Sequence, residues 1–315
     1  MRTGWSEVEF NGRRQWVSVR GAPRAPVLLF VHGGPGGAEF APRRRYLRDL
    51  ERDWLVIDWD QPGAGRSYRG DETSTSLSLE SLTADGVALV ALLADDFGDR
   101  PLVLAAHSFG TVLGVRIAER AQQHIHAYVG ASQVVNWALQ EARSYNWALE
   151  EARRAGHRKA EAALERIGRP IQGQYASGTD GVQIQRRWLG TLGGVAVNPR
   201  FVPVWALSIF TSRDYPLTTK LHYMRAMARS MDILWPRLCE EIDLARDTTT
   251  LEVPVHIFAG RQDRITDLAQ IEDWFAALEA PAKHLEIVDE AAHLNLYEAP
   301  GRFITFMDNV RAGLP

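Results

Sequence analysis

The chain has 315 residues, of which 45% are hydrophobic and 24% are charged, which is typical of a globular protein with one large domain or two smaller ones. Its formal net charge of −3 argues against nucleic acid or an anionic membrane surface as a partner, and its single cysteine excludes an internal disulfide. No run approaches about 18 apolar residues and the first residues lack the apolar stretch of a signal peptide, so we expect a soluble, cytoplasmic protein.

The first part of the chain alternates short apolar runs with helical patterns. It opens with two strand-like runs, residues 7–10 and 15–19, on either side of Asn11-Gly12, a pair that indicates a hairpin. Further strands are expected at residues 26–31, 54–59, 102–106 and 127–130, and helices at about 43–50 and 79–97. The alternation predicts an α/β fold with a mostly parallel central sheet and helices on both faces.

The pattern changes in the middle of the chain, where strand-like runs are absent and Ala, Glu, Arg and Trp are frequent. We expect a helical insertion that forms a cap, so that residues 1–132 and 246–315 make the core domain and residues 133–245 the cap domain. Trp137 and Trp147 are candidates to line a pocket between cap and sheet, although aromatic residues also fill a cap's own core. Alternation then returns, with strands expected at residues 255–259 and 284–288 and helices at 268–278 and 303–310.

A short stretch combines an apolar run, the polar turn His107-Ser108-Phe109-Gly110 and the start of a helix. This layout is typical of a nucleophile elbow, which lifts a serine hydroxyl above the carboxyl end of a strand. Ala106 stands where the G-x-S-x-G pattern has its first glycine, and we interpret the stretch as a variant elbow because a methyl group is the smallest intrusion. The alternative interpretation is a buried turn with an ordinary serine.

Three polar residues, Ser108, Asp263 and His293, each follow a predicted strand. Because the carboxyl ends of parallel strands lie along one edge of a sheet, we expect these side chains to meet there. Their order along the chain is the one expected of α/β-hydrolases. In that chemistry Ser108 is the nucleophile, His293 takes and returns its proton, and Asp263 orients the histidine.

A glycine-rich turn, His32-Gly33-Gly34-Pro35-Gly36, follows the third predicted strand. Such enzymes place a second backbone donor for the oxyanion at this position, since glycines let the chain approach the substrate closely. We expect the amide of Gly34, with Gly33 as the alternate, to act together with the amide of Phe109.

Several of these motifs together resemble the prolyl iminopeptidase family of α/β-hydrolases. They are His32-Gly-Gly-Pro-Gly36, Asp60-Gln-Pro-Gly-Ala-Gly-Arg-Ser67, His107-Ser-Phe-Gly110, Gly260-Arg-Gln-Asp263, and Ala292-His293 with Tyr297-Glu-Ala-Pro300. The resemblance implies an α/β-hydrolase fold, removal of an N-terminal proline or similar residue from short peptides, the triad Ser108, Asp263 and His293, and an oxyanion hole from Gly34 and Phe109. The chain departs from the family pattern at Ala106 and at Pro62, where an arginine is usual.

An aminopeptidase must also hold a substrate ammonium group, which requires carboxylates in or below the cap. The candidates to bind it are Glu39, Glu141 and Glu150, with Glu151 and Asp214 as further possibilities. None lies in a motif that matches the amine-binding glutamates of the family, and a solvated helix face explains Glu150 and Glu151 equally well.

Two other functions are considered beside a prolyl aminopeptidase acting through an acyl-enzyme. One is an esterase, lactonase or thioesterase for a hydrophobic metabolite, which the tryptophan-rich cap favours. The other is a non-hydrolytic binding protein or cyclase on the same scaffold. His32 and His107 are interpreted as structural, and no histidine has metal-ligand spacing, so no metal or cofactor is expected. The expected partner is a small molecule or short peptide, not nucleic acid or a membrane, and the oligomeric state is left open.

Overall fold

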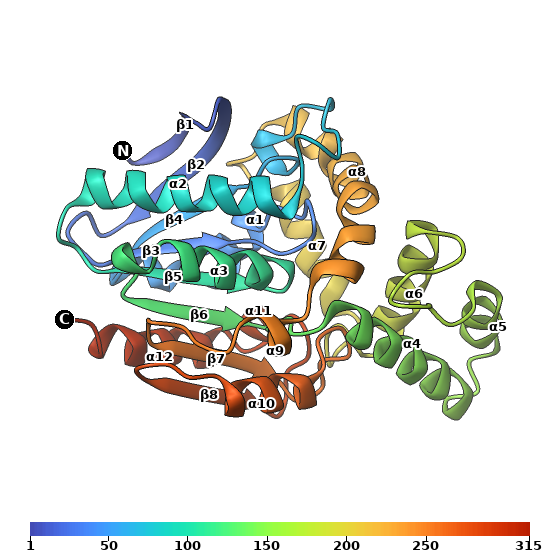
Figure 1. Cartoon of the computed structure of the whole chain (residues 1–315). Coiled ribbons are helices and arrows are strands. Elements are labelled where there is room, and N and C mark those ends of the chain that lie inside the picture. The colour runs from blue at the N-terminus through green and yellow to red at the C-terminus, as the bar shows by residue number, and fades with distance from the viewer.

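A computed structural model describes all 315 residues and has an eight-stranded sheet at its centre (Figure 1). The strands are β1 (Gly4–Phe10), β2 (Arg13–Gly21), β3 (Val27–Val31), β4 (Leu55–Asp60), β5 (Leu102–His107), β6 (Ala127–Ala131), β7 (Val255–Gly260) and β8 (Lys283–Val288). Their order across the sheet is β1-β2-β4-β3-β5-β6-β7-β8. β2 pairs antiparallel with β1 and β4, and all pairs from β4 to β8 are parallel, as the alternating pattern predicts.

Helices cover both faces of the sheet. The helices outside the inserted region are α1 (Phe40–Tyr46), α2 (Leu79–Phe97), α3 (Phe109–Arg120), α9 (Leu244–Asp247), α10 (Leu268–Ala277), α11 (Asn295–Glu298) and α12 (Pro300–Ala312), with 3-10 helices at Arg48–Arg52, Gly65–Ser67 and Gln122–His124. Leu29 and Val31 of β3 belong to the hydrophobic cluster that includes α2 and α3, whereas Leu28 and Phe30 belong to the cluster that includes α12. Both faces of β3 are buried, which explains why its sequence is continuously apolar.

The segment expected as one helix at residues 43–50 is divided in the structure. α1 ends at Tyr46 and a separate 3-10 helix follows over Arg48–Arg52. Leu47 lies between them with a φ of −121° and a ψ of 27°, outside the α-helical region, and its side chain is fully buried in the second cluster. The helix is therefore interrupted at this buried leucine, and the hydrophobic periodicity of the sequence does not reveal the interruption.

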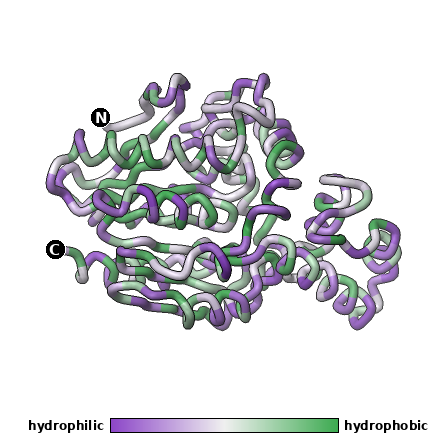
Figure 2. The backbone as a smooth tube through the Cα atoms, in the orientation of Figure 1, coloured by the Kyte–Doolittle hydropathy of each residue, from purple (hydrophilic) through white to green (hydrophobic).

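The expected helical insertion lies between β6 and β7. Its helices are α4 (Trp137–Arg154), α5 (Arg158–Ile167), α6 (Thr179–Thr191), α7 (Phe201–Thr211) and α8 (Leu217–Glu241). α4, α5 and α6 project away from the sheet, while α8 runs past the end at which β5 and β6 finish (Figure 1). Hydrophobic residues follow the strands of the sheet, whereas α8 carries both hydrophobic and hydrophilic residues (Figure 2). None of the helices has the length and apolar character that crossing a membrane requires.

Candidate active site

Ser108 occupies the turn between β5 and α3, at the carboxyl end of a central strand. Its φ of 52° and ψ of −126° are unusual for a residue other than glycine. The N–H of Ser108 donates to the carbonyl of Ala131 on the neighbouring strand at 3.0 Å, which ties this turn to the sheet. The conformation and place of Ser108 are those of a nucleophile elbow.

The departure at Ala106 is accommodated by a glycine on the helix behind the serine. A Cβ atom at Gly114 would lie 2.9 Å from the methyl group of Ala106 and 2.7 Å from the ring of Tyr128. Gly110 leaves similar room, because a side chain there would collide with the carbonyls of Val31 and His32. The methyl of Ala106 therefore occupies space that Gly114 leaves open, and α3 still packs closely on the sheet.

The structure brings Ser108, His293 and Asp263 together at one edge of the sheet. Nε2 of His293 lies 2.8 Å from Oγ of Ser108, and Nδ1 lies 2.9 Å from Oδ2 of Asp263. Oδ1 of Asp263 accepts from the N–H groups of Ile265 (2.7 Å) and Thr266 (2.9 Å), and the hydroxyl of Thr266 donates to Oδ2. Burial alone would raise the pKa of Asp263, but His293 and these donors outweigh it and hold the pKa below its usual value. Asp263 is therefore an anion suited to orient the ring of His293.

The glycine-rich loop after β3 lies directly against the serine. A Cβ atom at Gly33 would lie 3.1 Å from Cβ of Ser108, so only glycine fits there without displacing a neighbour. The N–H of Gly34 donates to no backbone or side-chain acceptor of the chain. The N–H of Phe109 is at the first position of α3, where a helix provides no internal acceptor. These two amides have the hydrogen-bonding capacity that an oxyanion requires.

His32 fixes this loop to its neighbour. Its Nδ1–H donates to the carbonyl of Gly33 at 2.8 Å, and its Nε2 accepts from the N–H of Gln61 at 3.2 Å. Burial lowers the pKa of His32 and favours the neutral ring that this pattern of donor and acceptor needs. His32 is therefore bonded within the loops, in keeping with the structural role expected for it.

A second histidine–carboxylate pair lies behind the serine, and it differs from what the sequence suggested. Nδ1 of His107 lies 2.9 and 3.0 Å from the two carboxylate oxygens of Glu39, and the hydroxyl of Tyr297 donates to Glu39 at 3.0 Å. Burial alone opposes both charges, but the pair raises the pKa of His107 and lowers that of Glu39. Glu39, a candidate to bind a substrate ammonium, is thus buried and already paired. Only the position of His107 next to Ser108 in the sequence could have signalled this cluster.

The other candidate carboxylates differ in their surroundings. Glu141 is fully buried in the cap, where it accepts from the hydroxyl of Tyr175 at 2.7 Å and pairs with the guanidinium of Arg186. Glu150 is exposed on α4. The remaining two are in ion pairs, Glu151 with Arg154 and Asp214 with Arg20 and Arg44.

The two tryptophans predicted to line a pocket have different surroundings. Trp137 is buried and packs edge-on against the rings of Phe109 and Trp235, with centroids 6.3 and 5.3 Å away. Trp147 lines a cavity of about 200 Å³ between α4 and the loop after β7, which Asp263 also lines. The guanidinium of Arg264 lies 5.4 Å from the ring centroid of Trp147 in that cavity. Trp137 thus supports the residue beside Ser108, while Trp147 lies in a cavity next to Asp263.

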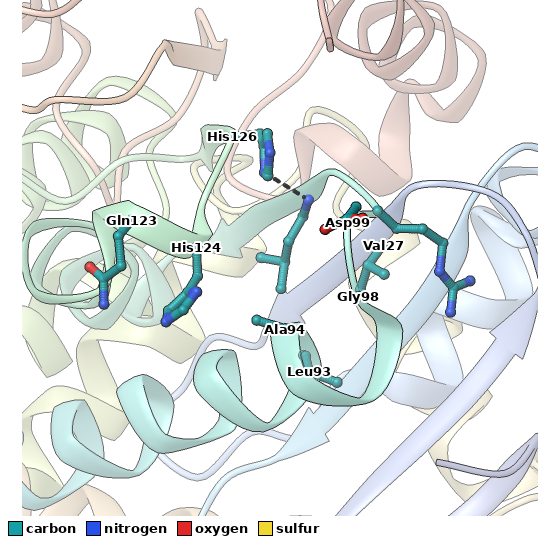
Figure 3. A pocket seen from close by; sticks show the side chains of 10 residues that line it. Val27, Leu93, Ala94, Gly98, Asp99, Gln123, His124 and His126 are labelled. Carbon is teal, nitrogen blue, oxygen red and sulfur yellow. Dashed lines mark hydrogen bonds between the residues drawn. The ribbon is translucent and has the colours of Figure 1, made fainter.

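A larger cavity, of about 310 Å³, lies at the opposite edge of the sheet (Figure 3). It is lined by the first residues of β3 and β5, Val27 and Leu102, together with His124 and His126. Nδ1 of His126 accepts from the N–H of Leu102 at 3.1 Å, as the dashed line in Figure 3 shows. No serine lines this cavity. The chain has no cluster of three or more His, Cys, Asp or Glu side chains that could hold a metal ion. The edge that carries Ser108 is therefore the candidate active site.

Comparisons with known proteins agree with this fold. A family model described as "Alpha/beta hydrolase family" matches residues 28–306. The chain is 25% identical over 300 residues to the protein of Bacillus subtilis (strain 168) described as "Probable aminopeptidase YbaC", covering 94% of this chain and 92% of that protein. A proline iminopeptidase structure from Mycobacterium smegmatis has a TM-score of 0.69 at 19% identity and covers 98% of both chains. The esterase RhEst1 from Rhodococcus sp. ECU1013 has a TM-score of 0.64 at 15% identity and covers 99% of this chain and all of that one. The two structures show a fold shared by enzymes with different substrates.

Proposed function

The chain belongs to the alpha/beta hydrolase family, and on this basis we propose that it is a serine hydrolase whose nucleophile is Ser108. The proposal rests on one distance above all, the 2.8 Å between Oγ of Ser108 and Nε2 of His293. A serine hydroxyl is a weak nucleophile at its own pKa and needs a base at this range. The carboxylate of Asp263 on the other ring nitrogen completes the arrangement.

The reaction proceeds through an acyl-enzyme. Oγ of Ser108 attacks the substrate carbonyl while Nε2 of His293 takes its proton, and the N–H groups of Gly34 and Phe109 bind the oxyanion. His293 then gives the proton to the leaving group as the bond to the carbonyl carbon breaks. Water, deprotonated by His293, cleaves the ester at Ser108 and returns the enzyme to its starting state. Residues 133–245 act as the cap that limits the access of bulk water.

Two substrate classes have support from different observations. The description of the Bacillus subtilis relative as an aminopeptidase favours an amide with a free N-terminal amine, such as that of an N-terminal proline. The ion pairs of two candidate carboxylates favour a neutral acyl compound instead. Glu39 is paired with His107 and Glu141 with Arg186, so neither is free to bind a substrate ammonium group. An aminopeptidase is our first proposal for the substrate, and an esterase of small acyl compounds is the second.

Labelling with a fluorophosphonate probe tests the nucleophile. We expect the probe to modify wild-type protein at Ser108 and to leave the Ser108→Ala variant unlabelled. Unchanged labelling of that variant would reject the proposed nucleophile.

Parallel assays with a prolyl arylamide and a short acyl ester separate the two substrate classes. A kcat/KM for the arylamide above that for the ester supports the aminopeptidase. The reverse order supports the esterase. The Ser108→Ala variant serves as the blank in both assays, retaining at most roughly 10³–10⁴-fold catalysis over water.

A further inference from the structure

Two consecutive helices of the inserted region present large apolar side chains to solvent. The exposed fractions are 70% for Leu217 and Leu221, 56% for Met224, 54% for Leu207, 45% for Val204 and 40% for Phe210. The first three residues lie on α8 and the last three on α7. We call these six side chains the α7–α8 face. Isolated exposed apolar residues are ordinary, but six from two neighbouring elements indicate an interaction surface.

α8 has two apolar sides. Tyr223, Ala226 and Ser230 are buried against the core, which is the side that holds the helix in place. Leu217, Leu221 and Met224 recur at a spacing of four and then three residues, which places them on one stripe opposite that buried side. A helix on the surface of a globular protein needs one apolar stripe for its own packing. The second stripe has no partner within the chain.

α7 contributes exposed apolar side chains and no charged residue to the α7–α8 face. Its sequence from Phe201 to Thr211 contains no charged residue, although Val204, Leu207 and Phe210 are all exposed. The ring of Phe210 lies 6.1 Å from that of Tyr223 on α8, so the two helices meet at this end. α7 and α8 are therefore adjacent at this end, which is also where the chain passes from one helix to the other.

The stretch from position 200 to 231, which contains the α7–α8 face, has more basic than acidic residues, and the acidic residues of α8, Asp232, Glu240 and Glu241, lie beyond it. Five basic residues occur between positions 200 and 231, namely Arg200, Arg213, Lys220, Arg225 and Arg229. The one acidic residue in this stretch, Asp214, is held in ion pairs with Arg20 and Arg44. On a helical projection Lys220 and Arg225 lie on either side of the apolar stripe of α8. The net charge of −3 conceals this basic region.

We propose that the α7–α8 face docks on an anionic lipid surface. Leu, Met and Phe side chains between basic residues are the pattern by which a helix lies at a membrane interface, where apolar groups enter the headgroup region and cations contact phosphates. A second copy of the chain is disfavoured, because a two-fold contact would set one basic face against the other.

Docking at this face would bring the active-site edge of the sheet close to the lipid. The inner side of α8 touches the loops that follow β3 and β4: the hydroxyl of Tyr223 donates to the carbonyl of Ala38 at 3.0 Å, and that of Ser230 donates to the carbonyl of Gly63 at 2.9 Å. Ala38 belongs to the loop that also carries Gly34. The lipid surface and the glycine-rich loop would therefore contact opposite sides of one helix.

Co-sedimentation with vesicles tests the proposal without reference to activity. We expect the full chain to sediment with vesicles of phosphatidylcholine and phosphatidylserine, and much less with vesicles of phosphatidylcholine alone. The double variant Leu221→Glu/Met224→Glu should lose binding by at least about tenfold, since it removes two apolar groups from the contact. The variant Lys220→Gln/Arg225→Gln should lose roughly tenfold, and only toward the anionic vesicles.

Ile171 offers a matched control, because it is 79% exposed but lies in the loop between α5 and α6. Ile171→Glu should bind vesicles as the wild type does, and thermal unfolding of all variants checks that they are folded. Failure of the wild type to sediment with anionic vesicles overturns the proposal, as does equal loss in Ile171→Glu. Light scattering that shows a wild-type dimer, dissociated by Leu221→Glu/Met224→Glu, would assign the face to self-association instead.

Discussion

The Nε2–H of His107 donates to the backbone carbonyl of His293, with 3.1 Å between nitrogen and oxygen. Nδ1 of the same ring faces the carboxylate of Glu39, so both ring nitrogens of His107 face acceptors, as a positively charged ring requires. The carbonyl of His293 also accepts from the hydroxyl of Ser132 at 2.8 Å. The histidine proposed as the base is thus held through its backbone by groups at the ends of β5 and β6.

Glu39→Gln should destabilise the protein in a pH-dependent way. The variant keeps the side-chain shape but leaves His107 without its counter-charge, and breaking such a buried pair costs about 3 kcal/mol. Because the pKa of Glu39 is lowered, the contribution of Glu39 to the free energy of unfolding is present above its ordinary pKa of 4.5 and is lost as the pH falls. Because the pKa of His107 is raised, the contribution of His107 to the free energy of unfolding is present below its ordinary pKa of 6.5 and is lost as the pH rises further. Urea unfolding should therefore show the largest difference from wild type between these two values.

A control for this experiment is Tyr297→Phe, which removes one donor to Glu39 and keeps the ion pair. It should cost about 1 kcal/mol without the same pH pattern. A difference between Glu39→Gln and wild type that stays constant across the pH range would show that His107 and Glu39 are not charged in the folded state.

Asp263→Asn should reduce kcat by roughly 10⁴-fold while the protein remains folded. The asparagine amide can donate to Nδ1 of His293, which would leave the proton on Nε2 and remove the base from Ser108. Steady-state kinetics on whichever substrate proves active provides the measurement. Asp267→Asn is the matched control, since this partly exposed residue of the same loop caps α10 and asparagine caps helices equally well. Retention of near-normal kcat in Asp263→Asn would remove the carboxylate from the mechanism.

The meeting of Ser108, Asp263 and His293 could be predicted because each cue is local. Each residue follows a strand of the parallel part of the sheet, β5, β7 or β8, and a parallel sheet necessarily brings the carboxyl ends of its strands to one edge. The pairing of Glu39 with His107 could not be predicted, because Glu39 lies in no motif and at no strand end, and only the folded chain places the two residues together.

The same limit applies to the cap. Glu141 is one of several candidates from the sequence to bind a substrate amine, but its partner Arg186 comes from another helix, 45 positions further along the chain. Helical periodicity identifies the helices of the insertion and does not fix which of their faces meet. The polar contacts of the cap therefore depend on packing that a single sequence leaves open.

Gly114→Ala should destabilise the protein because of Ala106. The new methyl would lie 2.9 Å from that of Ala106 and 2.7 Å from the ring of Tyr128, closer than carbon atoms tolerate. Overpacking of this kind costs typically 1–3 kcal/mol, an order-of-magnitude range that urea unfolding can resolve. Ala106→Gly alone should cost roughly 0.5–1 kcal/mol, the usual effect of glycine in a strand.

The double variant Ala106→Gly/Gly114→Ala is the decisive member of this set. It should be more stable than the sum of the two single losses predicts, because removing the methyl at Ala106 relieves one of the two contacts. The contact with Tyr128 remains, so we expect partial recovery. Strict additivity would mean that Gly114 does not compensate for the missing glycine at position 106.

The contribution of Asp60 to the free energy of unfolding should decrease as the pH rises toward neutrality. It is buried at the end of β4, where it accepts from the hydroxyl of Tyr215 at 2.9 Å and from the N–H of Arg66 at 2.8 Å, and burial raises its pKa to about 7. Since this exceeds its ordinary value of 3.8, the folded state binds the proton more tightly, and this contribution to the free energy of unfolding declines between about pH 4 and pH 7. Asp60→Asn should remove that decline, so its deficit relative to wild type should be larger at about pH 5 than at about pH 8 in urea titrations. Asp289→Asn, at an exposed site, should leave the slope unchanged; an identical slope in Asp60→Asn and wild type would show that Asp60 stays ionised throughout.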